Sequence, residues 1–303
     1  MGYHEFLCVM EKNLNRKLEG GVTASVHVTV KNNGKIKRGI LVEDPQVNIS
    51  PTIYLEEFYE QFQNGESMES ISEAVLKFYE SVRCSHSWDT KEVEEFEEAK
   101  KKIVFKVINR KRNAKLLEEV PHMDWMDLSI VFYVLLDIKK DGTATMLVRN
   151  EHLKMWNITE QELFPIACGN TVQLLPARIF TMKEILEGLM SSEGMTSRDV
   201  FDETAELPMD VMYVLTNTNR TNGSGCLFLP GVLDQLGKIF QGDYYILPSS
   251  VHEVIIVPQN KGFEAEELNE MVKEVNATQV EEEEQLSDHA YYYDWKKKQL
   301  EMR

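Results

Sequence analysis

The alternation of apolar and polar residues near the start of the chain predicts a helix followed by a β-hairpin. Every fourth residue from Phe6 to Leu18 is apolar, which places these side chains on one face of a helix. Apolar and polar residues then alternate strictly from Val22 to Val30, a pattern typical of a strand with one buried face. Asn33-Gly34 suits a tight turn, so we expect Ile36 to Val42 to return as the second strand.

Two further patterns predict elements in the middle of the chain. Leu128 to Leu136 is an almost unbroken apolar run, which is typical of a central strand covered on both faces. Thr159-x-x-Glu162 has the form of a capping box and predicts the start of a helix. Gly169 is the expected end of this helix.

A strand, a turn with glycine, a second strand and a helix follow one another three times. The turns are Asn33-Gly34, Asp141-Gly142 and Asn222-Gly223, and the third unit needs a return strand at Cys226–Leu229. Successive hairpins form antiparallel sheets, so the predicted fold class is α+β with helices packed on one side. The three units are either repeated modules or a chance recurrence of a common arrangement.

These elements group into three predicted segments. Residues 1–120 hold the N-terminal helix, the hairpin and further helices, 121–195 hold a middle hairpin-helix unit, and 205–303 hold a C-terminal α+β unit. Ser191 to Glu206 is polar without strong periodicity, which predicts a connector. A length of 303 residues is also compatible with one continuous domain.

The charge of the chain narrows the classes of partner. There are 33 Lys and Arg residues against 50 Asp and Glu residues, which gives a net charge of −17. Phosphate binding requires clustered cations, and so acidic a protein is repelled by nucleic acid and by anionic lipid. We therefore expect a protein partner, no direct nucleic-acid binding and no membrane binding.

The absence of several sequence features predicts the compartment of the protein and whether it binds a cofactor. The longest apolar run, Ile130 to Leu136, is too short to cross a bilayer. Cys8, Cys84, Cys168 and Cys226 lie far apart, which suits a reducing compartment, so a cytoplasmic location is expected. No nucleotide-binding loop and no H-E-x-x-H pair is present, so no cofactor is predicted.

Two short clusters contain residue types that could carry chemistry. Ser250, His252 and Glu253 offer a hydroxyl, an imidazole and a carboxylate, although on a strand Glu253 would point away from the other two. Their alternative role is a turn in which the hydroxyl satisfies backbone groups. His122, Asp124 and Asp127 offer nitrogen and oxygen ligands for a divalent ion, or side chains that cap a turn.

An aromatic cluster lies near the C-terminus. Asp288-His289 precedes Tyr291-Tyr292-Tyr293 and Trp295. Such a cluster could dock a partner, but the alternative is an edge strand packed on the sheet, since the segment before it is acidic.

Seven segments, in order along the chain, resemble one family. They are ISPTIYLEEFYEQFQNG, INRKRNAKLLEEVPH, DLSIVFYVLL, MYVLTN, ILPSSVHEVIIVP, NEMVKEVNAT and LSDHAYYY. From Phe6 to Tyr293 the chain is similar to the bacterial domain-of-unknown-function family five-six-eight-eight, known from anaerobic Gram-positive gut bacteria. The resemblance implies an association with integrative or phage-like elements and supplies no catalytic residue.

Three hypotheses about function follow. The leading one is a non-catalytic cytoplasmic interaction or regulatory protein, an accessory of a mobile element, which binds another protein through a sheet edge or the aromatic C-terminal region. The second is an enzyme, either a hydrolase that uses Ser250 and His252 or a metal-dependent enzyme around Asp124 and Asp127. The third is an acidic protein that imitates DNA and inhibits a DNA-binding enzyme, which the charge of −17 permits.

Overall fold

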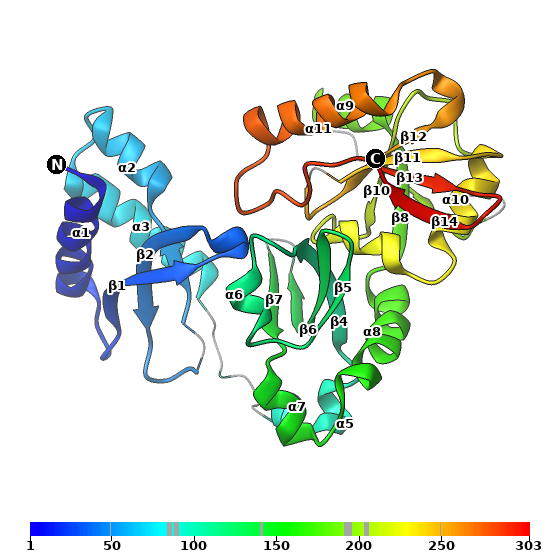
Figure 1. Cartoon of the computed structure of the whole chain (residues 1–303). Helices are drawn as coiled ribbons and strands as arrows, with labels where there is room; N and C mark the ends of the chain where they lie inside the picture. Colours follow the sequence, from blue (N-terminus) through cyan, green and yellow to red (C-terminus); the bar gives the residue numbers. More distant parts are fainter. Residues whose placement is uncertain are drawn as a thin grey trace. The chain divides into compact units, whose positions relative to one another are not determined.

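The chain forms two compact units, each with its own hydrophobic core (Figure 1). A computed structural model describes residues 1–48, 50–83, 87, 91–139, 142–190, 196–202, 206–248 and 250–303. The units are Met1–Thr90 and Lys91–Arg303. Both combine antiparallel sheets with helices, so the predicted α+β class is confirmed.

The first unit is a three-stranded sheet whose buried face is covered by helices. Its elements are α1 (Tyr3–Lys17), β1 (Thr23–Val30), η1 (Asn32–Gly34), β2 (Ile36–Glu43), β3 (Thr52–Tyr54), α2 (Glu56–Gln63) and α3 (Met68–Val82). The strands pair antiparallel in the order β1-β2-β3. Phe6 of α1, Ile40 of β2 and Val75 of α3 meet in one buried cluster. The stripe of apolar residues on each helix is therefore what joins it to the sheet.

The predicted hairpin is confirmed, together with its turn. β1 pairs with β2 from Thr23 opposite Glu43 to Val30 opposite Ile36. In the turn, Asn33 has φ 59° and Gly34 has φ 70°, the left-handed conformations that Asn and Gly tolerate.

The second unit contains two antiparallel sheets that share a core. The seven-stranded sheet has the order β14-β13-β11-β12-β10-β8-β9, and the smaller sheet has the order β4-β6-β5, with β7 also paired with β6. The strands are β4 (Ile103–Asn109), β5 (His122–Trp125), β6 (Leu128–Lys139), β7 (Gly142–Leu147), β8 (Ala177–Thr181), β9 (Arg198–Asp199), β10 (Tyr213–Asn217), β11 (Tyr244–Leu247), β12 (Val254–Pro258), β13 (Tyr291–Asp294) and β14 (Gln299–Met302).

Helices cover both faces of the seven-stranded sheet. Tyr244 of β11 belongs to the main core with Leu236 of α10, whereas the next residue, Tyr245, belongs to a second cluster with Leu268 of α11. Only the first unit therefore has its helices on one face alone. The helical elements of the second unit are α4 (Lys91–Glu94), α5 (Phe96–Ala99), α6 (Ala114–Leu117), α7 (Asn150–Trp156), α8 (Glu160–Leu174), α9 (Met182–Met190), η2 (Gly223–Phe228), α10 (Val232–Phe240), η3 (Gln259–Lys261) and α11 (Ala265–Thr278).

Two predicted elements of the second unit were wrong. The expected return strand at Cys226–Leu229 lies largely in the 3-10 helix η2, because β10 already pairs with β8 on one side and β12 on the other and has no free edge. The helix that begins at Thr159 does not end at Gly169 but continues to Leu174. Asn170 holds this helix against the smaller sheet by donating to the carbonyl groups of Lys100 and Ile103.

The division after Thr90 differs from the predicted segments. β4 pairs with β6 across residue 120, and β8 pairs with β10 across the predicted connector. β6 and β7 form the second predicted hairpin, although its Asp141 lies outside the described residues, as do 191–195 and 203–205 of the connector. Since strand pairing crosses the expected divisions, residues 91–303 form one unit.

Candidate functional site

The far half of the β1–β2 hairpin exposes apolar side chains that a sheet normally buries. Ala24 and the following even-numbered residues of β1 share one face; Ala24 is buried, but Val28 is 52% exposed and Val30 is 70% exposed. Ile36, opposite Val30, is 54% exposed, and Arg38 lies opposite Val28. We call Val28, Val30, Ile36 and Arg38 the outer hairpin edge. The apolar stripe of the first unit thus continues beyond the buried core.

The backbone of β1 is open along the same half. In the first half of this edge strand, Asn15 of α1 accepts the Ala24 N–H (2.9 Å) and donates to the Ala24 carbonyl (2.7 Å), and the Glu11 carboxylate accepts the Val26 N–H (3.2 Å). Even-numbered residues therefore turn their backbone groups away from β2. Val28 and Val30 do the same, and the described part of the chain provides no partner for them.

The charge around this edge is opposite to that of the whole chain. The hairpin sequence Thr23–Glu43 contains four cations, Lys31, Lys35, Lys37 and Arg38, and one acid, Glu43, a net charge of +3 against −17 overall. The Nζ atoms of Lys31 and Lys37 lie 4.6 and 5.7 Å from the centre of the Tyr54 ring. These cation–π contacts place two ammonium groups at one face of the sheet.

Ser250 and His252 lie in one loop, and their side chains make hydrogen bonds that hold this loop in place. Ser250 is buried, and its hydroxyl accepts the backbone N–H of His252 at 3.0 Å. Nδ1 of His252 lies 3.3 Å from the Asn222 backbone nitrogen, and Nε2 lies 3.2 Å from the Glu284 carboxylate. The tautomer that fits both contacts accepts at Nδ1 and donates at Nε2. Neither ring nitrogen is then left to take a proton from Ser250.

The loop that carries Glu253 is anchored to β10 and η2. The carbonyl of His252 accepts a hydrogen bond from the Thr216 hydroxyl (2.8 Å) and another from the Gly223 N–H (2.9 Å). Burial raises the pKa of Glu253, and the nearby charge of Arg220 opposes this shift. Glu253 is therefore a partly desolvated acid in a loop fixed by its backbone.

The three candidate metal ligands line an open pocket of about 660 Å³ in the second unit. His122 and Asp124 lie on β5, and Asp127 follows in the turn to β6. Nδ1 of His122 lies 3.0 Å from the carbonyl of Val120, and Nε of Arg110 lies 3.3 Å from the Asp124 carboxylate. Sequence reasoning thus selected three residues that share a pocket, because a short strand and its turn keep them close.

Both aspartates of this pocket already accept hydrogen bonds from other side chains of the protein. Asp124 accepts the Ser129 hydroxyl at 2.6 Å, and Asp127 accepts the hydroxyls of Ser287 at 2.6 Å and Tyr291 at 2.7 Å. In the part of the chain that the structure describes, no three His, Cys, Asp or Glu side chains are grouped so that they could hold a metal ion. The contacts are those of side chains that fasten a turn.

The aromatic C-terminal residues belong to the core. Tyr291, Tyr292 and Tyr293 are 0%, 9% and 4% exposed, and they form β13 between β11 and β14. The expected strand is therefore present, but it is not an edge. Trp295 covers Gly237 of α10 so closely that a Cβ atom there would lie 2.1 Å from the indole ring. These side chains form no exposed platform for a partner.

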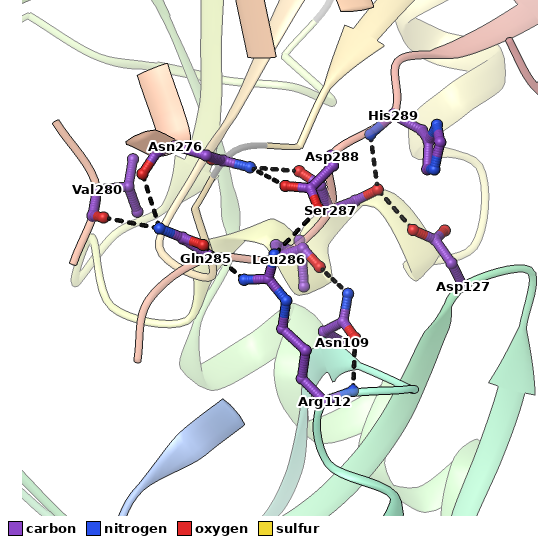
Figure 2. A network of polar contacts seen from close by, with 10 residues as sticks. All are labelled: Asn109, Arg112, Asp127, Asn276, Val280, Gln285, Leu286, Ser287, Asp288 and His289. Atoms are coloured by element: carbon purple, nitrogen blue, oxygen red, sulfur yellow. Dashed lines mark hydrogen bonds and ion pairs between the residues drawn. The ribbon is translucent and has the colours of Figure 1, made fainter. Parts of the chain in front are cut away.

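The segment before β13 is tied to the turn after β4, as Figure 2 shows. Arg112 donates to Gln285 at 2.5 Å and to Asp288 at 3.0 Å, and Asn109 donates to the carbonyl of Leu286 at 2.9 Å. These partners are separated by 173 to 177 residues in the sequence. The network therefore joins the end of β4, the first strand of the second unit, to the segment before β13.

Sequence reasoning missed the partners of His252 and the exposure of the hairpin. Glu284 lies in the acidic segment before the tyrosines, where no pattern singles it out, and Asn222 contributes only its backbone N–H, which leaves no sequence signal. The valines of β1 have the pattern of a buried face, so their exposure could not be read from alternation. The cluster of four cations was the available signal.

No described helix combines the length and the apolar character that a membrane crossing requires.

Comparison with known proteins identifies one family. Neither the curated proteins nor the solved structures contain a match to this chain. Residues 3–295 match the model of a family of unknown function, DUF5688, which confirms the resemblance of the ordered sequence segments. The chain belongs to the DUF5688 family.

Proposed function

We propose that this chain is a non-catalytic protein-interaction protein that binds an extended segment of another protein at the outer hairpin edge. The exposure of Val28 and Val30 on an open strand edge is the observation that carries the proposal. A strand added beside β1 would bond to the outward N–H and C=O groups of both residues. Open edges invite aggregation, and α1 protects only the first half of this one.

The size of the edge suits a weak, reversible complex. Full burial of a Val or Ile side chain contributes about 1.5–3 kcal/mol, and Val28 and Ile36 are already about half covered, whereas Val30 is 70% exposed. Association and ordering of the partner offset much of this gain. We therefore expect dissociation constants that are roughly micromolar.

The two other hypotheses find less support among the contacts. Ser250 and His252 are engaged in fixing their own loop, as described above. A DNA mimic needs free carboxylates at regular phosphate spacing. Several surface acids are instead paired with basic neighbours: Glu69 with Lys17, Glu97 with Lys100, and Glu98 with Lys101. Such local pairs are typical of an ordinary solvated surface.

A displayed library of random ten-residue peptides, selected on the full chain, tests the proposal. Val28→Thr/Val30→Thr keeps side-chain shape and strand propensity but removes apolar contact area. The matched control is Met302→Thr, which changes an exposed residue of the edge strand β14. We expect enriched peptides to bind the double variant at least about tenfold more weakly, equivalent to about 1.4 kcal/mol, and to bind the control unchanged.

Circular dichroism and thermal unfolding would establish that both variants fold. Because Val28, Val30 and Met302 are exposed, we expect their unfolding to match that of the wild type within about 0.5 kcal/mol per site. Failure of the library to yield binders, or binders that ignore the hairpin substitutions, would contradict the proposed function.

A further inference from the structure

We infer that the outer hairpin edge pairs with the same edge of a second copy of this chain, and that this pairing covers the edge until a partner segment displaces the second copy. The inference rests on the proposed function and adds a regulatory state of the same surface. It follows from the register of the hairpin, because the open half of β1 is complementary to itself about a twofold axis at Thr29.

The backbone of β1 limits such pairing to Val28 and Val30. The N–H of Lys31 donates to the carbonyl of Lys35 within the hairpin (2.7 Å), so by alternation the two valines present their N–H and C=O groups outward. The Val26 N–H is already bound by Glu11, which ends the open stretch. Only when Val28 lies opposite Val30 of the second copy are the outward groups of both valines in both copies paired.

The side chains of this register match on both faces of the sheet. Val28 and Val30 meet their equivalents on one face, and Ile36, which lies opposite Val30 in the hairpin, extends the apolar row. These residues are exposed in the single chain, so pairing removes apolar surface from water. On the other face, Thr29 lies opposite Thr29 of the second copy, and Thr–Thr is a favourable cross-strand pair.

The same register keeps the cations of the two hairpins apart. Lys31 follows Val30 and His27 precedes Val28, so Lys31 lies opposite His27 of the second copy and not opposite another lysine. Lys37 and Arg38 lie on β2, three strand spacings or about 14 Å from the corresponding strand of the other copy. This separation exceeds the Debye length of about 8 Å, so repulsion between them is largely screened at physiological salt.

The short contact gives a weak dimer that a partner can displace. Pairing over Val28–Val30 is shorter than an ordinary strand of about 5–6 residues, and small interfaces are typical of transient complexes. We therefore expect a dissociation constant of roughly 10–100 μM. A partner segment competes with the second copy because both use the same outward backbone groups. Until it binds, the second copy protects an edge that would otherwise invite aggregation.

Disulfide cross-linking of the full chain tests the register. In a Cys8→Ser/Cys84→Ser background, where the other two cysteines are buried, Thr29→Cys places two thiols across the twofold axis. Their Cα atoms would be about 4.5 Å apart, a separation that a disulfide spans. The control is His27→Cys on the same face of β1, because its equivalents would be about 14 Å apart. We expect mild oxidation at about 100 μM protein to cross-link Thr29→Cys at least tenfold more than His27→Cys.

Sedimentation velocity from about 1 to 300 μM protein measures the association itself. We expect the wild type and the control Met302→Thr to form dimers with the same dissociation constant, and Val28→Thr/Val30→Thr to dimerise at least about tenfold more weakly. A chain that stays monomeric, a dimer that ignores the double substitution, or equal cross-linking of the two cysteine variants would overturn the self-pairing.

A labelled synthetic peptide with the sequence of residues 23–31 tests whether pairing closes the edge. By fluorescence anisotropy it should bind the reduced Thr29→Cys variant at least about tenfold more tightly than the oxidised dimer. Equal binding to both forms would overturn the regulatory role.

The outcomes also separate this inference from the proposed function. Library peptides that depend on Val28 and Val30, together with a chain that never dimerises, would retain the proposed function and overturn the self-pairing. A dimer with the expected cross-link in a chain that yields no library binders would contradict the proposed function and overturn the displacement of the second copy, leaving this edge as a dimer surface alone.

Discussion

β1 and β13 show how two strands that carry large apolar side chains acquire opposite environments. β13 lies between two strands, and its tyrosines are buried on both faces of the seven-stranded sheet. Among the residues that the structure describes, β1 has only β2 beside it, and the apolar face of its outer half is exposed at Val28 and Val30. An exposed apolar strand face is stabilised when other residues pack on it. The comparison shows that the sequence of the strand does not tell whether those residues come from the same chain.

The largest expected effect comes from truncating one side chain in each strand and comparing the loss of stability. Tyr291→Ala is expected to destabilise the second unit by about 3–5 kcal/mol, because it empties a fully buried aromatic site and removes a donor from Asp127. Val30→Ala should change the first unit by less than about 0.5 kcal/mol, because Val30 is exposed.

Denaturant unfolding of the full chain, followed by circular dichroism and tryptophan fluorescence, measures both effects. The two units need separate transitions in the analysis, since two-state behaviour is expected of single domains. Similar losses for the two variants would mean that the hairpin is covered and that β1 and β13 do not differ.

A glycine in the second unit gives the next largest effect. A Cβ atom at Gly223 would lie 2.1 Å from the Thr216 hydroxyl and 2.6 Å from the His252 carbonyl oxygen. Gly223→Ala should therefore cost about 1–3 kcal/mol or more, because the backbone of η2 must shift away from β10. Gly242→Ala is the control, since nothing lies within 4 Å of a Cβ atom there. Equal unfolding midpoints for the two variants would contradict this close packing.

The network in Figure 2 predicts a smaller and salt-dependent effect. Arg112→Ala removes the donors to Gln285 and Asp288, in a pair whose side chains are 31% and 44% exposed. We expect a loss of about 1 kcal/mol in the second unit that decreases at high salt, because a partly exposed ion pair is screened. Lys115→Ala, an exposed cation in the nearby helix α6, should have no such effect.

Glu253 gives the smallest effect and a pH dependence. Burial raises the pKa of its carboxyl group above the ordinary 4.5, so the folded state holds this proton more tightly than the unfolded state. The resulting stability is present below the ordinary pKa and is lost as pH rises through the raised pKa. Glu253→Gln should therefore have a higher melting temperature than the wild type at pH ~7, with a difference that shrinks toward pH ~4.

Melting temperatures across this pH range, with Glu274→Gln on α11 as an exposed control, provide the measurement. A glutamine variant that is less stable than the wild type at neutral pH would mean that the charge of Arg220 outweighs burial at Glu253.

The sequence by itself determined the elements whose signals are local. The valine alternation and Asn33-Gly34 fixed the first hairpin, since a two-residue period and a left-handed turn depend only on neighbouring residues. The capping box likewise formed as predicted, and Glu162 bonds to both the backbone and the hydroxyl of Thr159. These contacts lower the pKa of Glu162. The family resemblance also came from the sequence alone.

Only the tertiary structure decided which surfaces are open. Cys226–Leu229 could have paired as a strand, but β8 and β12 occupy both sides of β10. The candidate residues His252 and Asp127 found partners far along the chain, in Glu284 and Tyr291. Burial and pairing depend on segments that folding brings together. The exposure of the outer hairpin edge, which carries the proposed function, was therefore decided by the tertiary structure.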